Sequence, residues 1–259
     1  PEACESEGAE ECKGSTTEPE LVGASILPFS VDPKWGRIYF LLGKERKHTH
    51  WVQGSEQWSD FGGRADPNDI DAEHIAAREF MEETMACVKY FEDDVCPRTQ
   101  YQDIVDSLYR KEYLFRLMRG SNNEQYITFV KQIPWDPRAI TRFKDSRQLL
   151  LKLKGCSATS IAEEYGNSDI MKHPAVNTTP GGAISVAQQF MEKKRIAFWI
   201  IPHLKDAIVS SGALLSSNGH VERCRSHFLS FMKNLLEELI FYAPQCLKTD
   251  IREGLPGVE

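Results

Sequence analysis

Three glutamates within five residues are the feature that most constrains how this chain folds. Residues 78–84 read R-E-F-M-E-E-T, so Glu79, Glu82 and Glu83 stand at positions i, i+3 and i+4. On an α-helix this spacing places the three carboxylates on one face, about a turn apart. The residues expected to form an opposing apolar stripe are Ile75, Ala76, Phe80 and Ala86. Because like charges so close repel one another, we expect a positive group beside the acidic face.

The overall composition excludes several classes of protein. With 41% hydrophobic and 27% charged residues, the 259-residue chain resembles an ordinary soluble globular protein that can bury one sizeable core. No apolar run approaches the roughly 20 residues of a membrane helix, so we expect no membrane partner. A net charge of -7 and a pI of about 5.6 argue against a basic nucleic-acid-binding surface, and DNA is not an expected partner. The seven cysteines are odd in number and include no C-x-x-C pair, which indicates reduced thiols in the cytoplasm or an organelle.

The order of the patterns predicts an α/β domain. Residues 1–18 are acidic and polar and are expected to be disordered, residues 19–246 form a single domain, and residues 247–259 form a flexible tail. Two β-like runs, from Val22 and from Arg37, flank the turn D-P-K-W-G and predict a hairpin. A short third segment, W-S-D-F-G-G-R, leads to the acidic helix, for which Asp71 is the expected N-cap.

The second half of the chain contains patterns of both kinds. We expect a strand in residues 87–91, followed by a largely helical insertion at about 92–195. Within it, the apolar spacing predicts a helix in the first half of residues 101–119, a strand at 124–133 and a helix at 183–195. Residues 195–204 resemble a strand that runs into a helix, and residues 222–242 predict a closing helix.

A carboxylate cluster that follows a Gly-Gly loop suits a hard divalent cation. Mg²⁺ and Mn²⁺ prefer oxygen ligands, and they commonly share these ligands with substrate phosphates. Gly62 and Gly63 allow the backbone to approach a ligand closely, and N–H groups near the start of the helix favour a phosphate. The alternative interpretation is a solvated charged helix face.

The segment GGRADPNDIDAEHIAAREFMEETMA, residues 62–86, resembles the Nudix box, G-x5-E-x7-R-E-U-x-E-E-x-G-U, in which U is aliphatic. The matching residues are Gly63, Arg78, Glu79, Phe80, Glu82 and Glu83. The resemblance implies a Nudix-type α/β/α sandwich with a mixed sheet, here enlarged by the helical insertion. It also implies that Glu79, Glu82 and Glu83 hold Mg²⁺ or Mn²⁺, and that Arg78 orients a glutamate through a charge-assisted hydrogen bond.

Two departures from the box concern its loops. The segment from Gly63 to Arg78 is one residue longer than the standard spacing, and Asp69 stands where the first glutamate is expected. At the end of the box, Met85 and Ala86 stand where the family has a glycine. The R-E-x-x-E-E core is intact.

The resemblance implies hydrolysis of a phosphoanhydride bond in a nucleoside diphosphate linked to another group, a small diphosphate substrate. Glu79, Glu82, Glu83 and Arg78 are then the catalytic residues. Substrate contacts are expected from the two glycines and from three basic residues, Arg64, Lys44 and Arg46. The general base stays open between Glu82, Glu83 and a downstream glutamate, for which Glu163, Glu164 and Glu192 are the candidates.

Two alternatives stay open. The substrate of such a hydrolase is an RNA 5′ end if Arg110, Lys111, Arg116 and Arg119 form a basic groove. The fold could instead serve as a catalytically weak ligand-binding or assembly subunit, including a homo-oligomer. Trp58 and Phe61 are candidates for stacking on a base, although burial in the core is the commoner fate of such aromatic residues.

Overall fold

The computed structural model describes residues 19–47, 55–92, 99–120, 124–160, 173–215 and 219–242. The predicted disordered segment 1–18 and the predicted tail 247–259 lie outside these residues, as do Glu163 and Glu164. Among the described helices, none combines the length and the apolarity that a bilayer span requires. In the same part of the chain, Cys87, Cys156 and Cys224 are free thiols.

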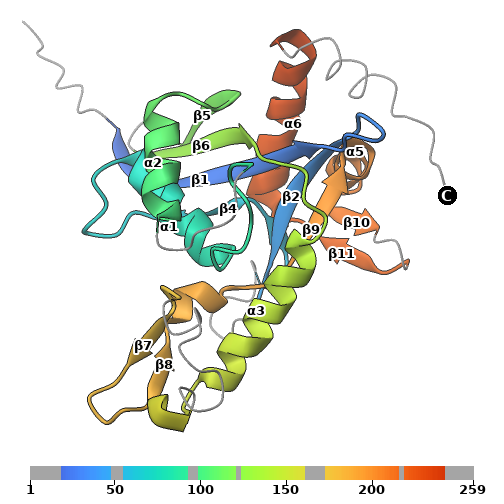
Figure 1. Cartoon of the computed structure of the whole chain (residues 1–259). Helices are drawn as coiled ribbons and strands as arrows, with labels where there is room; N and C mark the ends of the chain where they lie inside the picture. Colours follow the sequence, from blue (N-terminus) through green and yellow to red (C-terminus); the bar gives the residue numbers. More distant parts are fainter. Residues whose placement is uncertain are drawn as a thin grey trace, which may run out of the picture.

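A mixed β-sheet forms the centre of the fold (Figure 1). In the described residues its strands are β1 (Glu20–Val31), β2 (Ile38–Glu45), β3 (Trp58–Ser59), β4 (Phe61–Arg64), β5 (Phe115–Gly120), β6 (Glu124–Gln132) and β9 (Lys193–Ile200). Strand β1 pairs in parallel with β6 along one edge. Along its other edge it pairs antiparallel with β4 through its first half and with β2 through its last residues. The predicted hairpin of β1 and β2 is therefore confirmed.

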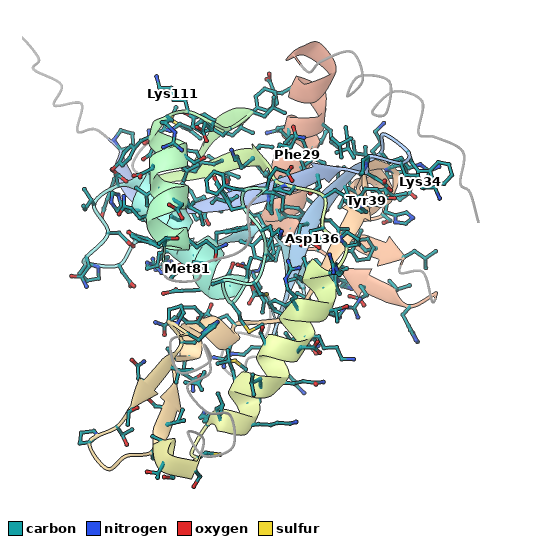
Figure 2. All side chains as sticks on the ribbon, in the orientation of Figure 1. Phe29, Lys34, Tyr39, Met81, Lys111 and Asp136 are labelled. Carbon is teal, nitrogen blue, oxygen red and sulfur yellow. The ribbon has the colours of Figure 1, made fainter. Side chains whose placement is uncertain are left out.

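Helices cover both faces of the sheet, as Figure 1 shows. On one face lie α1 (Ala72–Glu83) and α2 (Gln100–Tyr109), and on the other lie α5 (Ile201–Val209) and α6 (Ser226–Tyr242). Side chains point alternately to the two faces of the sheet along β1, so the strand contributes to a hydrophobic core on each face. Ala24 and Ile26 pack under α1, whereas Leu27 and Phe29 pack under α6. Figure 2 shows Phe29 among the side chains that fill the space around the sheet. The predicted α/β class with a mixed sheet is confirmed.

The remaining elements lie at the border of the sheet. They are α3 (Ala139–Leu153), the hairpin of β7 (Val176–Thr178) and β8 (Ile184–Val186), the 3-10 helix η2 (Gln188–Met191), and the hairpin of β10 (Ala213–Leu215) and β11 (Val221–Arg223). Figure 1 shows α3, β7 and β8 extending away from the sheet. The stretch 92–195, predicted as a helical insertion, thus contains α2 and α3 but also supplies β5 and β6 to the sheet itself.

Two local predictions are wrong. Residues 87–91 form no strand; Val88 and Tyr90 are buried in the core beneath α1, but they reach it from an irregular segment. Residues 183–195 form no α-helix, because their apolar residues are divided between β8, η2 and the start of β9. Both segments bury apolar side chains as expected, and buried apolar spacing alone does not determine the backbone conformation.

Candidate active site

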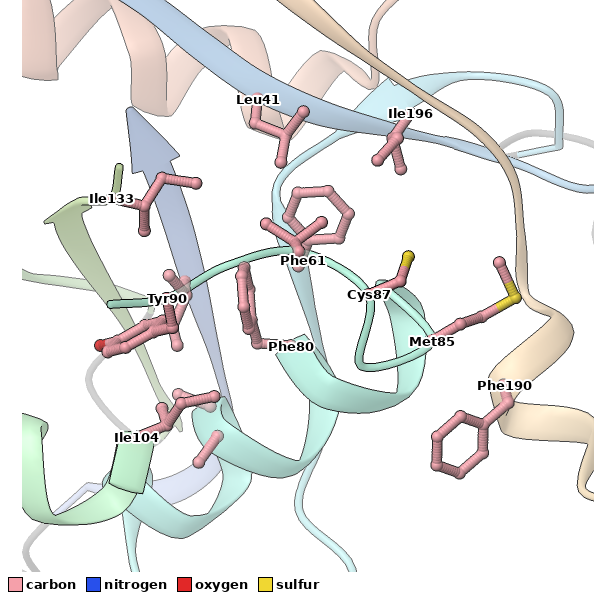
Figure 3. Close-up of a cluster of buried hydrophobic side chains, with 14 of the residues drawn as sticks. Leu41, Phe61, Phe80, Met85, Cys87, Tyr90, Ile104, Ile133, Phe190 and Ile196 are labelled. Carbon is pink, nitrogen blue, oxygen red and sulfur yellow. The ribbon is translucent and has the colours of Figure 1, made fainter. Parts of the chain in front are cut away.

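Helix α1 carries the glutamate cluster, and its packing fixes where the cluster lies. Asp71 caps the helix as predicted, because its side chain accepts a hydrogen bond from the His74 N–H at 3.1 Å. On the buried side, the ring of Phe80 meets that of Phe61 from β4 edge-on, with centroids 5.6 Å apart (Figure 3). The α1 axis is therefore held directly against β4, the strand that contains Gly62 and Gly63.

The end of α1 explains the missing glycine of the box. Met85 and Ala86 both have left-handed backbone conformations, with φ of 53° and 49°, where glycine is normally preferred. The Ala86 N–H donates to the carbonyl of Met81 at 2.8 Å, which closes the helix. Met85 is buried in the core, near Phe190 in Figure 3. Thus two non-glycine residues adopt the turn for which the family uses glycine.

Arg78 donates hydrogen bonds to three carboxylates, and its Nε lies 3.8 Å from a fourth, that of Asp66. Its Nε and Nη2 donate to the two oxygens of Asp69 at 3.1 and 2.8 Å. Its Nη1 donates to Glu79 at 2.9 Å and to Glu82 at 3.2 Å. Burial raises the pKa of Asp69, but the hydrogen bonds from Arg78 outweigh this effect and hold the pKa below its ordinary value. Asp69, at the box position where a glutamate is expected, thus binds the arginine across the longer loop.

Gly63 makes room for Glu79. A Cβ atom at Gly63 would lie 2.3 Å from Oε1 of Glu79, closer than real atoms approach. Burial raises the pKa of Glu79 to about 7 and also raises the pKa of Glu82. These two carboxylates are thus held beside a glycine strand in surroundings that disfavour their negative charge.

Glu83 lies in a different environment from Glu79 and Glu82. Its Oε2 accepts a hydrogen bond from the Gly62 N–H at 2.8 Å, and its Oε1 lies 3.0 Å from Nζ of Lys193. Lys193 also pairs with Glu45, and Glu45 in turn pairs with Arg225 at 2.6 Å. Burial lowers the pKa of Lys193, but the facing carboxylates of Glu45 and Glu83 raise it above its ordinary value. The ammonium group therefore stays charged.

The residues around Arg78 fit a divalent cation. Glu79 and Glu82 offer carboxylate oxygens, the ligand atoms that Mg²⁺ and Mn²⁺ prefer. One guanidinium group faces four carboxylates, those of Asp66, Asp69, Glu79 and Glu82, so the carboxylates outnumber the cation. A divalent ion beside Glu79 and Glu82 would offset part of this excess of negative charge.

A cavity of about 880 Å³ adjoins the two glycines. Its walls come from β4, β5 and α6, and they include Gly62, Gly63 and Arg64. Another part of the lining is Arg119, whose guanidinium lies over the rings of Tyr126 and Phe231, 4.4 and 4.8 Å from their centroids. Strand β4 connects the cavity with the carboxylates of α1, because Gly62 and Gly63 line the cavity while Gly62 donates to Glu83 and Gly63 faces Glu79. The described lining itself includes no residue of α1.

The structure places the other predicted contact residues in several environments. Lys44 forms an ion pair with Glu222 at 3.0 Å. Arg46 donates to Gln188 at 3.0 Å and lines a separate cavity of about 120 Å³. Of the three predicted basic contacts, Arg64 lines the large cavity.

Trp58 and Phe61 are fully buried in the core, so the core interpretation of these two aromatic residues holds. The downstream candidate Glu192 offers a carboxylate oxygen to a cluster that also contains Glu45 and Glu83. In the described part of the chain, the ligand atoms of these three residues lie within 4.8 Å of one another.

The sequence reasoning missed Glu45, Lys193 and Arg225. Glu45 and Lys193 are cross-strand partners in β2 and β9, but they are 148 residues apart in the chain. One signal was available, because Glu45 falls at the end of a predicted strand and Lys193 lies just before another. Only the strand register brings them together.

Comparisons with known proteins find similar solved structures. No protein-family model matches the chain, and no curated protein matches it either. Among solved structures, the chain is similar to the NUDIX domain of Shewanella oneidensis NrtR complexed with ADP ribose, at 11% identity and a TM-score of 0.39, with 88% of this chain and 94% of that chain covered.

Two further structures are similar to the chain. The first is a mutT/nudix family protein from Listeria innocua, at 15% identity and a TM-score of 0.35, with 87% of this chain and 99% of that chain covered. The second is a C. elegans Ap4A hydrolase, at 12% identity and a TM-score of 0.34, with 83% of this chain and 97% of that chain covered. The NrtR domain and the Listeria protein carry, in their descriptions, the name of the family whose box the sequence resembles.

Proposed function

We propose that this chain is a Nudix-type hydrolase that depends on Mg²⁺ or Mn²⁺ and cleaves a phosphoanhydride bond in a nucleoside diphosphate linked to another group. The observation that supports this most is the position of Glu79 and Glu82. Arg78 holds both carboxylates, that of Glu79 faces Gly63, and Gly63 also lines a cavity of about 880 Å³. A diphosphate whose nucleoside lies in that cavity would reach the carboxylates across the glycines.

The roles of the box residues follow from their contacts. Glu79 and Glu82 are the proposed metal ligands, and Glu83 is the third carboxylate of the site. A divalent cation held there supplies Lewis-acid stabilisation of phosphoryl charge and lowers the pKa of a bound water. Arg78 fixes Glu79 and Glu82 in place and ties them to Asp69 in the preceding loop. Gly62 and Gly63 leave open backbone beside the cavity, where phosphate oxygens can approach.

The cavity supports a substrate with a nucleoside-sized group. Its volume lies within the range of pockets that bind small molecules, and it combines apolar walls with a few polar groups. Arg64 is the basic residue that we propose for the phosphate chain, because it lies on the cavity wall next to the two glycines. Glu192 is our candidate for the general base, since its carboxylate lies close to that of Glu83.

A small diphosphate is favoured over an RNA 5′ end. Arg110 pairs with Glu112 at 2.7 Å, and Arg119 pairs with Asp60 at 3.1 Å, so two of the four residues predicted for a basic groove face carboxylates. Lys111 projects from the outer end of α2 in Figure 2. An RNA substrate held by several phosphate contacts would lose affinity steeply as salt rises, whereas a small diphosphate would lose much less.

The deciding experiment measures phosphate and nucleotide release from a panel of diphosphates with and without Mg²⁺. The panel contains dinucleoside polyphosphates, ADP-ribose, NAD-type molecules, diphosphoinositol phosphates and capped or triphosphorylated RNA. Metal-dependent release that falls by orders of magnitude in Glu82→Gln would support the proposal. Tight binding without release would instead support the ligand-binding module. Turnover close to that of the wild type in both Glu82→Gln and Glu83→Gln would end the assignment of the site.

A further inference from the structure

The side chain of Lys193 is fully buried. Lys193 is the first residue of β9, its side chain is 0% exposed, and its methylene chain crosses Gly43 of β2. A Cβ atom at Gly43 would lie 2.8 Å from Cδ of Lys193, so the glycine provides the channel through which the side chain passes. A lysine is almost never buried in this way unless it is paired.

The partners of Lys193 saturate its ammonium group. Nζ donates to Glu45, donates to the hydroxyl of Ser59 at 3.1 Å, and lies 3.0 Å from Oε1 of Glu83. An ammonium group has three N–H donors and no acceptor, so these three partners account for all of them. Lys193 is thus a fixed cation that bridges the last box glutamate and a carboxylate of β2.

The same carboxylates form the geometric basis of a metal site. Glu45, Glu83 and Glu192 each offer an oxygen, and these oxygens lie within 4.8 Å of one another. Two of the three already contact the ammonium group of Lys193. A divalent ion placed among them would lie against a positive charge that is held in place, because the Lys193 side chain is fully buried and packs against Gly43.

The balance of charge differs between the two halves of the site. Two cations, Lys193 and Arg225, lie among the three carboxylates of Glu45, Glu83 and Glu192. Around Arg78, by contrast, one guanidinium group faces four carboxylates, those of Asp66, Asp69, Glu79 and Glu82. The larger excess of carboxylates is therefore on the side of Glu79 and Glu82.

We propose that Lys193 is a built-in counter-ion that occupies the place of a divalent cation between Glu45, Glu83 and Glu192. It closes this position to metal, so the site holds metal on the Glu79 and Glu82 side alone. Lys193 also acts as a positioning residue, because it holds the carboxylate of Glu83 that the Gly62 N–H holds from the other side. This inference deepens the proposed function and rests on it for the identity of the Glu79 and Glu82 ligands.

The test counts Mn²⁺ ions per chain by electron paramagnetic resonance in the full-length protein and in Lys193→Met. Methionine matches the length of the lysine stem and removes its charge. We expect the variant to bind one more Mn²⁺ than the wild type, and its thermal midpoint to rise more than that of the wild type when Mn²⁺ is added. Lys193→Met combined with Glu45→Gln should return to the wild-type count, because the extra position then lacks one carboxylate.

The adjacent lysine supplies a matched control. Lys194 pairs with Glu56 at the surface, away from the enclosed carboxylates, so Lys194→Met should leave the Mn²⁺ count unchanged. An unchanged count in Lys193→Met would overturn the inference.

A second measurement needs no variant and keeps the inference testable if Lys193→Met does not fold. Wild-type crystals grown with Mn²⁺ should give an anomalous peak beside Glu79 and Glu82, and none between Glu45, Glu83 and Glu192. A peak between the latter three carboxylates would overturn the inference while leaving the proposed function intact. An absence of Mn²⁺ at all of these carboxylates would instead count against the proposed function, and it would also overturn the inference, which places the metal beside Glu79 and Glu82.

Discussion

Replacing Glu83 with glutamine should destabilise the protein more than the same change at Glu82. The two oxygens of Glu83 accept from different donors, Oε1 from Lys193 at 3.0 Å and Oε2 from the Gly62 N–H at 2.8 Å. A glutamine amide offers one acceptor oxygen and one NH₂ group. Whichever way the amide turns, its NH₂ group faces a donor, so either the ammonium group or the backbone N–H loses its partner.

The expected cost follows from that lost partner. A buried donor left without an acceptor costs about 1–3 kcal/mol, and donors that are charged lie towards the upper end. Removing a carboxylate that is itself deprived of water offsets part of this cost, so we expect the free energy of unfolding to fall by about 2 kcal/mol. Glu82 accepts from Nη1 of Arg78 at 3.2 Å, and an amide oxygen can keep that contact. For Glu82→Gln we therefore expect a loss below about 1 kcal/mol.

Thermal unfolding followed by circular dichroism measures the difference. For a chain of this size, 1 kcal/mol corresponds to about 2–4 °C in the midpoint, so Glu83→Gln should unfold about 4–8 °C below the wild type. Glu82→Gln should stay within about 4 °C of it. Equal midpoints for the two variants, or a stable Glu83→Gln, would refute the assignment of both Glu83 oxygens to fixed donors. Metal-free buffer is required, because a bound ion would change the stability of the two variants unequally.

Three further changes test other parts of the argument. Gly63→Ala should abolish Mn²⁺ binding and lower turnover by at least about 100-fold. The new Cβ would lie 2.3 Å from Oε1 of Glu79 and would displace this proposed ligand. Isothermal titration with Mn²⁺ measures the loss of binding. Asp136→Asn should destabilise the protein at neutral pH but not in acid. Burial raises the pKa of Asp136, but the hydrogen bond from Arg142 outweighs this effect, so the pKa in the folded protein lies below its ordinary value. The resulting stability is present above about pH 4, and it is lost as the pH falls through the pKa of Asp136 in the folded protein. Ala86→Gly should change the free energy of unfolding by less than about 1 kcal/mol, since relief of the left-handed backbone at φ 49° offsets the loss of a buried methyl group; urea unfolding measures it.

Each of these changes has its own control. Gly181→Ala introduces a Cβ with its nearest neighbour 4.0 Å away, so it should leave Mn²⁺ binding unchanged; loss of binding in both glycine variants would point to a general effect of the methyl group. A constant gap between Asp136→Asn and the wild type from pH 7 to pH 2 would contradict the lowered pKa of Asp136. Met85→Gly relieves a similar left-handed backbone conformation but removes a buried side chain, so the free energy of unfolding should fall by about 2–5 kcal/mol. A similar loss in Ala86→Gly would show that the relief of backbone strain is negligible.

Local sequence signals predicted the elements that depend on local physics. The turn D-P-K-W-G between two β-like runs predicted the β1–β2 hairpin, and Asp71 before an apolar stripe predicted the start of α1. The resemblance to the Nudix box aligned Asp69 with the expected glutamate despite the longer loop. In the structure, Nε and Nη2 of Arg78 donate hydrogen bonds to both oxygens of Asp69, a contact that the box spacing alone could not establish.

Other features depended on contacts between distant parts of the chain. Val88 and Tyr90 are buried, as a strand prediction requires, yet no neighbouring strand lies where their backbone could pair in the described residues. Lys44 and Arg46 looked alike at the end of a strand, but the structure gives Lys44 the carboxylate of Glu222 and Arg46 the amide of Gln188. Such partners come from β11 and η2, and a single sequence contains no register from which to infer them.

The repulsion between the three glutamates was expected from the sequence, but Lys193, one of the two groups that offset it, was not. Helical spacing places Glu79, Glu82 and Glu83 about a turn apart, and it predicts that something positive lies beside them. The structure divides that task between two internal cations, since Arg78 contacts Glu79 and Glu82 whereas Lys193 contacts Glu83. These two cations already offset part of the repulsion between the three glutamates. The larger excess of carboxylates lies around Arg78, which faces Asp66, Asp69, Glu79 and Glu82, and this is the side on which we propose the divalent ion.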